Sequence, residues 1–107
     1  MKRNKIIKLE IILPAVYTQK LIYLFETFQV TGYSAVEIVL GRGEKHGAFE
    51  SDGLLSTGKS LLFFSVLDKN HFLQLRKELK DFLHEYGGAY VLTDVLEATN
   101  LKPTKNE

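Results

Sequence analysis

The spacing of apolar residues along this chain changes from that of a strand to that of a helix, and this order of periods constrains the fold most. Alternate positions between residues 5 and 13 are apolar, as in a β-strand: Ile7, Leu9, Ile11 and Leu13. A first helical stripe follows: Leu21, Leu24, Phe25 and Phe28. A second helical stripe lies in the C-terminal half: Phe72, Leu75, Leu79, Phe82 and Leu83. Two amphipathic helices are therefore predicted.

Three further strands are predicted between and after these helices. Residues 33–40 are rich in β-branched side chains, and residues 60–67 are apolar on both faces. Residues 89–97 form the last predicted strand, and residues 101–107 form a polar tail. With no internal repeat and no linker, residues 1–107 are predicted to form one domain.

Proline, glycine and short polar residues mark the ends of these elements. Pro14 ends the first strand and can open the helix that follows, because its missing N–H is not needed there. We expect Gly32 to close the first helix. Asp68 or Asn70 can cap the second helix, and Gly87-Gly88 ends it.

The resulting order, βαββαβ, predicts a ferredoxin-like fold. It has a four-stranded antiparallel sheet, both helices on one face, and a long loop between the second and third strands. The helices cover one face only, whereas the first and third strands carry apolar residues on both. Exposure would forfeit about 1.5–3 kcal/mol for each uncovered side chain. The uncovered set is one of two, either the following residues or their alternates on the same strands: Ile6, Ile12, Leu62, Phe64 and Val66. We therefore expect an oligomer that packs sheet against sheet.

The composition excludes several classes of function. A net charge of +1 provides no field for nucleic acid or an anionic membrane surface. The chain has no cysteine, so disulfides, thiol catalysis and thiolate zinc sites are excluded. No apolar stretch approaches the roughly 18–20 residues of a membrane span. A soluble cytoplasmic protein without membrane insertion is expected.

A glycine-rich segment at about residues 41–59 separates the second and third strands. Loops of this length in compact domains tend to be functional. It begins with Gly41-Arg42-Gly43, and the turn before the second strand reads Thr31-Gly32-Tyr33-Ser34. These two motifs resemble those of the PII-like signalling proteins, in which a T-G-x-[ST] turn precedes the strand and a G-x-G lies at the base of the flexible T-loop. The order of elements is similar over nearly the whole chain.

This resemblance implies a homotrimeric signal sensor, not an enzyme. Its ligand would be a small anion, such as AMP, ADP, a cyclic nucleotide or bicarbonate, bound in a cleft between subunits. The T-loop would regulate a partner such as a transporter or a metabolic enzyme. The resemblance implies the following nucleotide-binding residues: Gly32, Ser34, Gly41, Arg42, Gly43, Lys59, Gly87 and Gly88. Closely spaced glycines can bring backbone N–H groups to a phosphate, but tight turns also use glycine without any ligand.

Two departures from the family pattern concern the ligand's charge. PII proteins carry lysine in the turn before the last strand and arginines just after it, which hold a triphosphate. Here residues 84–88 contain no lysine, and residues 96–100 contain no arginine. Several charge-assisted contacts of about 1.5–3 kcal/mol each would be missing. A less charged ligand than ATP is expected.

Other motifs are less consistent with the predicted fold. Residues 53–60 match the phosphate-binding pattern G-x-x-x-x-G-K-[ST], but a strand rather than a helix is predicted to follow them. Phe63 and Phe64 are adjacent and so point to opposite faces, unlike the stacking aromatics of an RNA-recognition domain. The three histidines share no metal-ligand spacing: His46, His71 and His84. The alternative that stays open is a CutA-like or uncharacterised PII-fold trimer that binds a partner or a metal and no nucleotide.

Overall fold

The computed structural model describes residues 5–39, 42–43, 47–48 and 59–99. Along the chain its elements are β1 (Ile6–Pro14), a 3-10 turn (Ala15–Tyr17), α1 (Thr18–Thr27), β2 (Ser34–Ile38), β3 (Arg42–Gly43), β4 (Gly47–Ala48), β5 (Ser60–Asp68), α3 (Lys69–Tyr86) and β6 (Ala89–Asp94). The polar tail, residues 101–107, lies outside the described residues.

The predicted four-stranded antiparallel sheet is confirmed, with the order β2-β5-β1-β6. Its two central strands, β1 and β5, pair along their whole length, from Ile6 opposite Asp68 to Pro14 opposite Ser60. The short strands β3 and β4 pair with each other as a separate two-stranded ribbon. The edge strands end earlier than expected, since residues 33–40 and 89–97 were the predicted spans.

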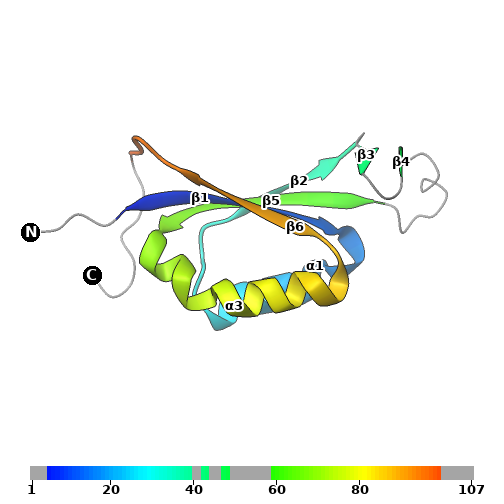
Figure 1. Ribbon diagram of the computed structural model, residues 1–107, viewed down its shortest axis with the longest axis horizontal. Helices are drawn as coiled ribbons and strands as arrows, with labels where there is room; N and C mark the ends of the chain where they lie inside the picture. Colours follow the sequence, from blue (N-terminus) through cyan, green and yellow to red (C-terminus); the bar gives the residue numbers. More distant parts are fainter. Residues whose placement is uncertain (1–4, 40–41, 44–46, 49–58, 100–107) are drawn as a thin grey trace, which may run out of the picture.

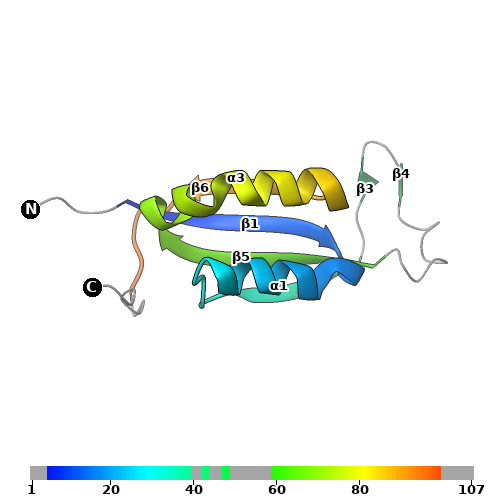
Figure 2. The ribbon, with the colours of Figure 1, turned by 90° about the horizontal axis from the view of Figure 1, so that it is seen from below.

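Both helices cover one face of the sheet, as predicted. Figure 2 shows α1 and α3 side by side, α1 over β5 and β2 and α3 over β1 and β6. Between the two layers lies a core built from alternate residues of β1 and β5, from the helical stripes and from Val30 after α1: Ile7, Leu9, Ile11, Leu13, Leu21, Phe25, Val30, Phe63, Leu67, Phe72, Leu75, Leu79 and Leu83. Burial of this apolar surface is the main term that holds the layers together. Neither α1 nor α3 is long and apolar enough to span a membrane.

The first helix ends differently from the prediction. It stops at Thr27, five residues before Gly32, and Gln29 takes the left-handed conformation with φ of 60°. The N–H of Val30 then donates to the carbonyl of Phe25 at 2.8 Å, which is the pattern of a Schellman motif. Val30 enters the core as a result, and Gly32 belongs to the connection between α1 and β2.

The ends of the second helix agree better with the sequence. Asp68 holds the N-cap position but makes no side-chain capping bond there. Instead the N–H of Lys69 donates to the carbonyl of Lys5 at 2.8 Å, which ties the helix start to β1. At the other end the N–H of Gly87, with φ of 86°, donates to the carbonyl of Leu83, so the predicted glycine C-cap is confirmed.

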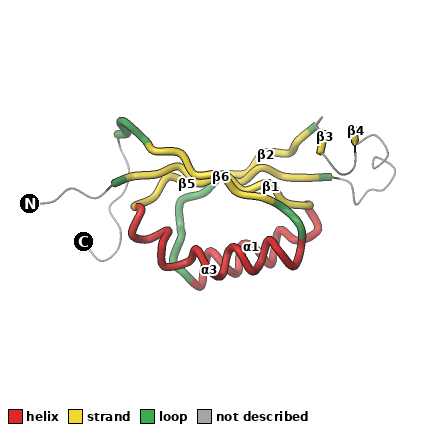
Figure 3. Tube along the Cα trace, viewed as in Figure 1, coloured by secondary structure: helices red, strands yellow, loops and turns green. Residues whose placement is uncertain are grey.

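The opposite face of the sheet, which we call the open face, carries no helix (Figures 1 and 3). The predicted alternates of β1 and β5 lie on it, because Ile12 pairs with Leu62 and alternates with the buried Ile11. Several of its apolar side chains remain accessible, with exposed fractions of 47% for Ile12, 49% for Val36 and 57% for Val91. This is the uncovered apolar surface that the strand pattern predicted.

Candidate functional site

One end of the sheet gathers residues that are far apart in the sequence. There β1 and β2 end while β5 and β6 begin, because neighbouring strands are antiparallel. We call it the loop end, since the segment between β2 and β5 leaves and re-enters the sheet there (Figure 1). Three of the predicted nucleotide-binding residues come together at this end: Lys59, Gly87 and Gly88.

Lys59 is anchored through its backbone while its ammonium group stays accessible. Its carbonyl accepts a hydrogen bond of 2.9 Å from the N–H of Ala15, in the 3-10 turn after β1. Its Nζ lies 3.5 Å from Oε2 of Glu37 on β2, and these side chains are 67% and 52% exposed. An exposed ion pair of this kind contributes only about 0–1 kcal/mol. The ammonium can therefore exchange the Glu37 carboxylate for a stronger anion.

Aromatic side chains line the helix side of the loop end. The ring centroids of Tyr17 and Tyr86 are 4.7 Å apart, and those of Phe82 and Tyr86 are 4.8 Å apart. Lys20 Nζ lies 5.6 Å from the centroid of the Tyr86 ring, in cation–π range. This cluster, which joins the start of α1 to the end of α3, was not predicted from the sequence.

Gly87 and Gly88 both have a structural role in the turn from α3 to β6. Gly87 has the positive φ of a helix C-cap, and Gly88 has φ of 140°. A Cβ atom on Gly88 would lie 2.6 Å from the backbone oxygen of Ile12. Glycine at position 88 is therefore required by the close approach of this turn to β1, whether or not a ligand also binds there.

The structure does not bring the other five predicted site residues together in one place. Arg42 and Gly43 form β3, and Gly41 lies outside the described residues. Gly32 and Ser34 lie nearer the other end of the sheet, where the Gly32 carbonyl accepts a hydrogen bond from the buried Ser65 hydroxyl. Along β5, Ser65 and Lys59 are about 20 Å apart at the usual rise of a strand. One protomer does not unite Gly32 and Ser34 with the loop end.

The other motifs have structural explanations. Ser60, the last residue of the G-x-x-x-x-G-K-[ST] match, begins strand β5, so no helix N-terminus follows that motif. Phe63 is buried beneath the helices, whereas Phe64 is half-buried on the open face, as adjacent strand residues must be.

The histidines do not gather into one site. His71 contacts the carbonyl of Phe28 through Nε2 at 2.6 Å, His84 is exposed in the last turn of α3, and His46 lies outside the described residues. Within the described ranges, no three His, Asp or Glu side chains are grouped as a metal site would require.

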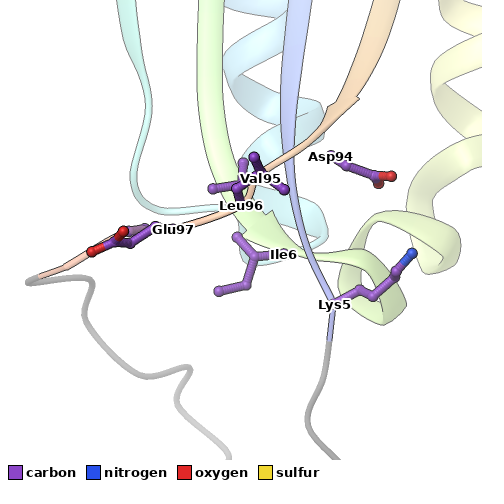
Figure 4. Close-up of a pocket in the computed structure, with 7 residues that line it drawn as sticks. Lys5, Ile6, Asp94, Val95, Leu96 and Glu97 are labelled. Atoms are coloured by element: carbon purple, nitrogen blue, oxygen red, sulfur yellow. The ribbon is translucent and has the colours of Figure 1, made fainter.

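A hollow of about 310 Å³ lies at the end of the sheet opposite the loop end. Seven residues line it: Lys5, Ile6, Asp94, Val95, Leu96, Glu97 and Ala98. Figure 4 shows Lys5 and Asp94 on one side of Ile6 and Glu97 on the other. Two carboxylates and one ammonium leave this hollow with an excess of negative charge, which disfavours a phosphate ligand.

Solved structures with the same fold cover most of this chain. CPII from Thiomonas intermedia K12, a nitrogen regulatory PII-like protein solved with ADP, AMP and bicarbonate, is 20% identical with a TM-score of 0.70, over 91% of this chain and 97% of that one. The chain has the PII-like fold. GlnK from B. subtilis, solved in complex with ATP, is 15% identical with a TM-score of 0.62, over 90% of this chain and 89% of that one.

A third similar structure is named without a ligand. This DUF3240 family protein from Shewanella baltica OS155 is 12% identical with a TM-score of 0.70, over 94% of this chain and 100% of that one. Neither the family models nor the curated protein sequences give a match to this chain. The PII-like fold therefore rests on structural similarity at low identity, in agreement with the resemblance of the two glycine motifs.

Proposed function

We propose that this protein is a cytoplasmic, non-enzymatic PII-like sensor that binds AMP, ADP or a cyclic adenine nucleotide, with or without bicarbonate. The ligand binds in a cleft between subunits of a homotrimer. The T-loop, at about residues 41–59, then engages a regulated partner such as a transporter or a metabolic enzyme. The protein binds no nucleic acid and does not insert into a membrane.

The observation that carries this proposal is the match to CPII, whose structure holds ADP, AMP and bicarbonate, over nearly all of this chain. The loop end supplies a matching chemical group. Lys59 presents an exposed ammonium at the base of the T-loop, and its ion pair with Glu37 is weak enough to be replaced. A phosphate binds such a group more strongly than a single exposed carboxylate does, because it carries more charge and more acceptor oxygens.

The charges around β6 favour a ligand with fewer phosphates than ATP. The last turn of α3 and the turn before β6 contain His84 and Glu85 but no lysine, and residues 95–99 after β6 contain no arginine. Neither place offers a strong cation for a γ-phosphate, so AMP or ADP should bind at least as tightly as ATP.

Subunit assembly is part of the proposal because one protomer separates the predicted site residues. Along β5, the partner of Gly32, Ser65, is about 20 Å from Lys59, and the partner of Ser34, Phe64, is about 16 Å from it. The open face, with Ile12, Val36 and Val91 about half exposed, supports packing of a second sheet against it. A neighbouring subunit can then bring its Gly32 region to the loop end of the first.

Titration calorimetry with AMP, ADP, cyclic AMP and ATP, each with and without bicarbonate, tests the proposal. We expect AMP, ADP or cyclic AMP to bind at least as tightly as ATP, with no hydrolysis. Lys59→Ala should weaken binding about tenfold, or about 1.4 kcal/mol. Lys80→Ala, on the exposed side of α3, is the matched control and should bind as the wild type does. A tenfold preference for ATP would contradict the charge argument, and equal binding by the two lysine variants would contradict the role of Lys59.

The second candidate is a CutA-like or uncharacterised PII-fold trimer that binds a protein partner or a metal and no nucleotide. The same fold occurs in the DUF3240 family protein over 94% of this chain, and a shared fold does not by itself fix a ligand. Absence of heat with every nucleotide, from a protein that still forms the trimer, would favour this candidate over the nucleotide sensor.

A further inference from the structure

The open face carries an oppositely charged pair at its centre. Lys8 and Glu10 both lie on β1, two residues apart and therefore on the same side of the sheet. Lys8 stands opposite Val66 and Thr93, and Glu10 stands opposite Phe64 and Val91. Three of these four neighbours are apolar, so two charges stand among mainly apolar side chains on the face that the helices leave uncovered.

The contact between these two charges is loose. Lys8 Nζ and Glu10 Oε2 are 3.8 Å apart, and the side chains are 42% and 33% exposed. A charge-assisted hydrogen bond would measure about 2.7–2.9 Å. Lys8 Nζ also lies 5.4 Å from the centroid of the Phe64 ring. An ammonium has three donors and a carboxylate has about four acceptor sites, so this one contact leaves most of their capacity for a partner above the sheet.

The occupant that fits this surface is a second copy of the same chain. A surface with charge of one sign would repel its own copy, whereas this face has one positive and one negative group side by side. Lys8 of one copy can approach Glu10 of the next while the apolar side chains around them meet. The segment after β6 rises on the same side of the sheet, away from the helices (Figure 1), and its Leu96 is 99% exposed. This segment therefore adds to the surface offered to a second copy.

We propose that Lys8 and Glu10 form ion pairs between copies of this chain and fix the register in which the open faces meet. This inference rests on the homotrimer of the proposed function. Around a three-fold axis, three ammonium groups and three carboxylates can alternate with no net charge. Any sliding of one sheet along another would bury these groups with only the loose contact of 3.8 Å between them, which disfavours other registers.

Two charge-reversal variants, measured alone and as a mixture, distinguish ion pairs between copies from an ion pair within one chain. Lys8→Glu gives a chain with two negative groups on the face, and Glu10→Lys gives a chain with two positive groups. Neither variant can form the pair within its own chain, but a mixture can form it between chains. Assembly is measured by light scattering and native mass spectrometry over a range of concentrations. Far-UV circular dichroism checks that each variant is folded.

We expect each single variant to need at least a tenfold higher concentration than the wild type to assemble. An equimolar mixture should recover assembly and contain both chains in one particle. Glu78→Lys and Lys80→Glu, charge reversals on the exposed side of α3, are the matched controls and should assemble as the wild type does. The milder variants Lys8→Gln and Glu10→Gln give the same test with smaller shifts if a reversal impairs folding.

Two failures are distinguishable. A wild-type chain that stays at 12.2 kDa at micromolar concentration would overturn the trimer of the proposed function, and the ion pairs with it. A wild-type trimer whose single variants match the α3 controls, or whose mixture assembles no better than its components, would overturn the ion pairs alone.

Discussion

Gly88 gives the sharpest test of the structure, because its replacement by alanine has a calculable cost. The added methyl carbon would lie 2.6 Å from the backbone oxygen of Ile12 and 3.0 Å from Cδ2 of Leu83. The leucine side chain can move aside, but the Ile12 backbone is fixed by the pairing of β1 with both of its neighbours. The turn must therefore shift away from β1.

The expected loss of stability follows from two terms. A residue with a side chain at φ of 140° adopts a conformation almost reserved for glycine, at a cost of about 1–3 kcal/mol. Overpacking against a fixed backbone atom adds about 1–3 kcal/mol. Gly88→Ala should thus lower the free energy of unfolding by about 2–6 kcal/mol.

Alanine substitutions at two other glycines separate the cost of the backbone conformation from the cost of overpacking. Gly87 has φ of 86° and ψ of 139°, and a Cβ atom added there would meet no atom within 4 Å, so Gly87→Ala should cost only the backbone term of about 1–3 kcal/mol. Gly32 has open space around it and no positive φ, so Gly32→Ala should stay within about 0.5 kcal/mol of the wild type. Urea unfolding at one fixed protein concentration measures all three, because assembly would otherwise shift the apparent stability. Equal losses for Gly87→Ala and Gly88→Ala would refute the steric argument.

Three further predictions concern helix ends and the loop end. Gln29→Gly should raise the free energy of unfolding by about 0.5–1 kcal/mol in the same assay, because glycine relieves the left-handed backbone at this position; a loss would contradict it. His71→Ala should lower the free energy of unfolding by about 1 kcal/mol, because it removes the hydrogen bond between His71 and the Phe28 carbonyl at the end of α1. His84→Ala, the exposed control, should change that free energy little. Equal effects of the two variants would argue against this hydrogen bond. Glu37→Gln should tighten ADP binding about two- to fivefold in calorimetry, because it removes the carboxylate that competes for Lys59; unchanged affinity would show that Lys59 does not meet the ligand.

The sequence predicted the faces of the strands better than the ends of the helices. Alternation determines which side of β1 is buried, because a strand has a period of two and leaves little freedom. The predicted end of α1 was wrong, because glycine is preferred at a left-handed C-cap but other residues can also adopt that conformation. Here the chain turns at Gln29, so that Val30 packs into the core beside Phe25, and Gly32 is left without that role.

The spacing of apolar residues also could not predict some of the contacts in the candidate site. The pair formed by Glu37 and Lys59 depends on the register of β2 against β5, and a long connection does not fix that register as a tight hairpin would. The contact between Tyr17 and Tyr86 joins two turns from opposite ends of the chain. The Lys59 position itself was predictable, because it lies where an aperiodic segment gives way to an apolar strand.

The central place of β1 affects how the chain can fold as it is synthesised. Ile12 pairs with Leu62 on one side and with Ala89 on the other, so β1 leaves the ribosome well before either of its partner strands, β5 and β6. Such non-local pairing is associated with folding in milliseconds to seconds rather than microseconds. A nascent chain that stalls before Ala89 would expose an apolar strand with an unsatisfied hydrogen-bonding edge, which is the form most prone to aggregate. Late truncations should therefore reduce the yield of soluble protein more than their length alone would suggest.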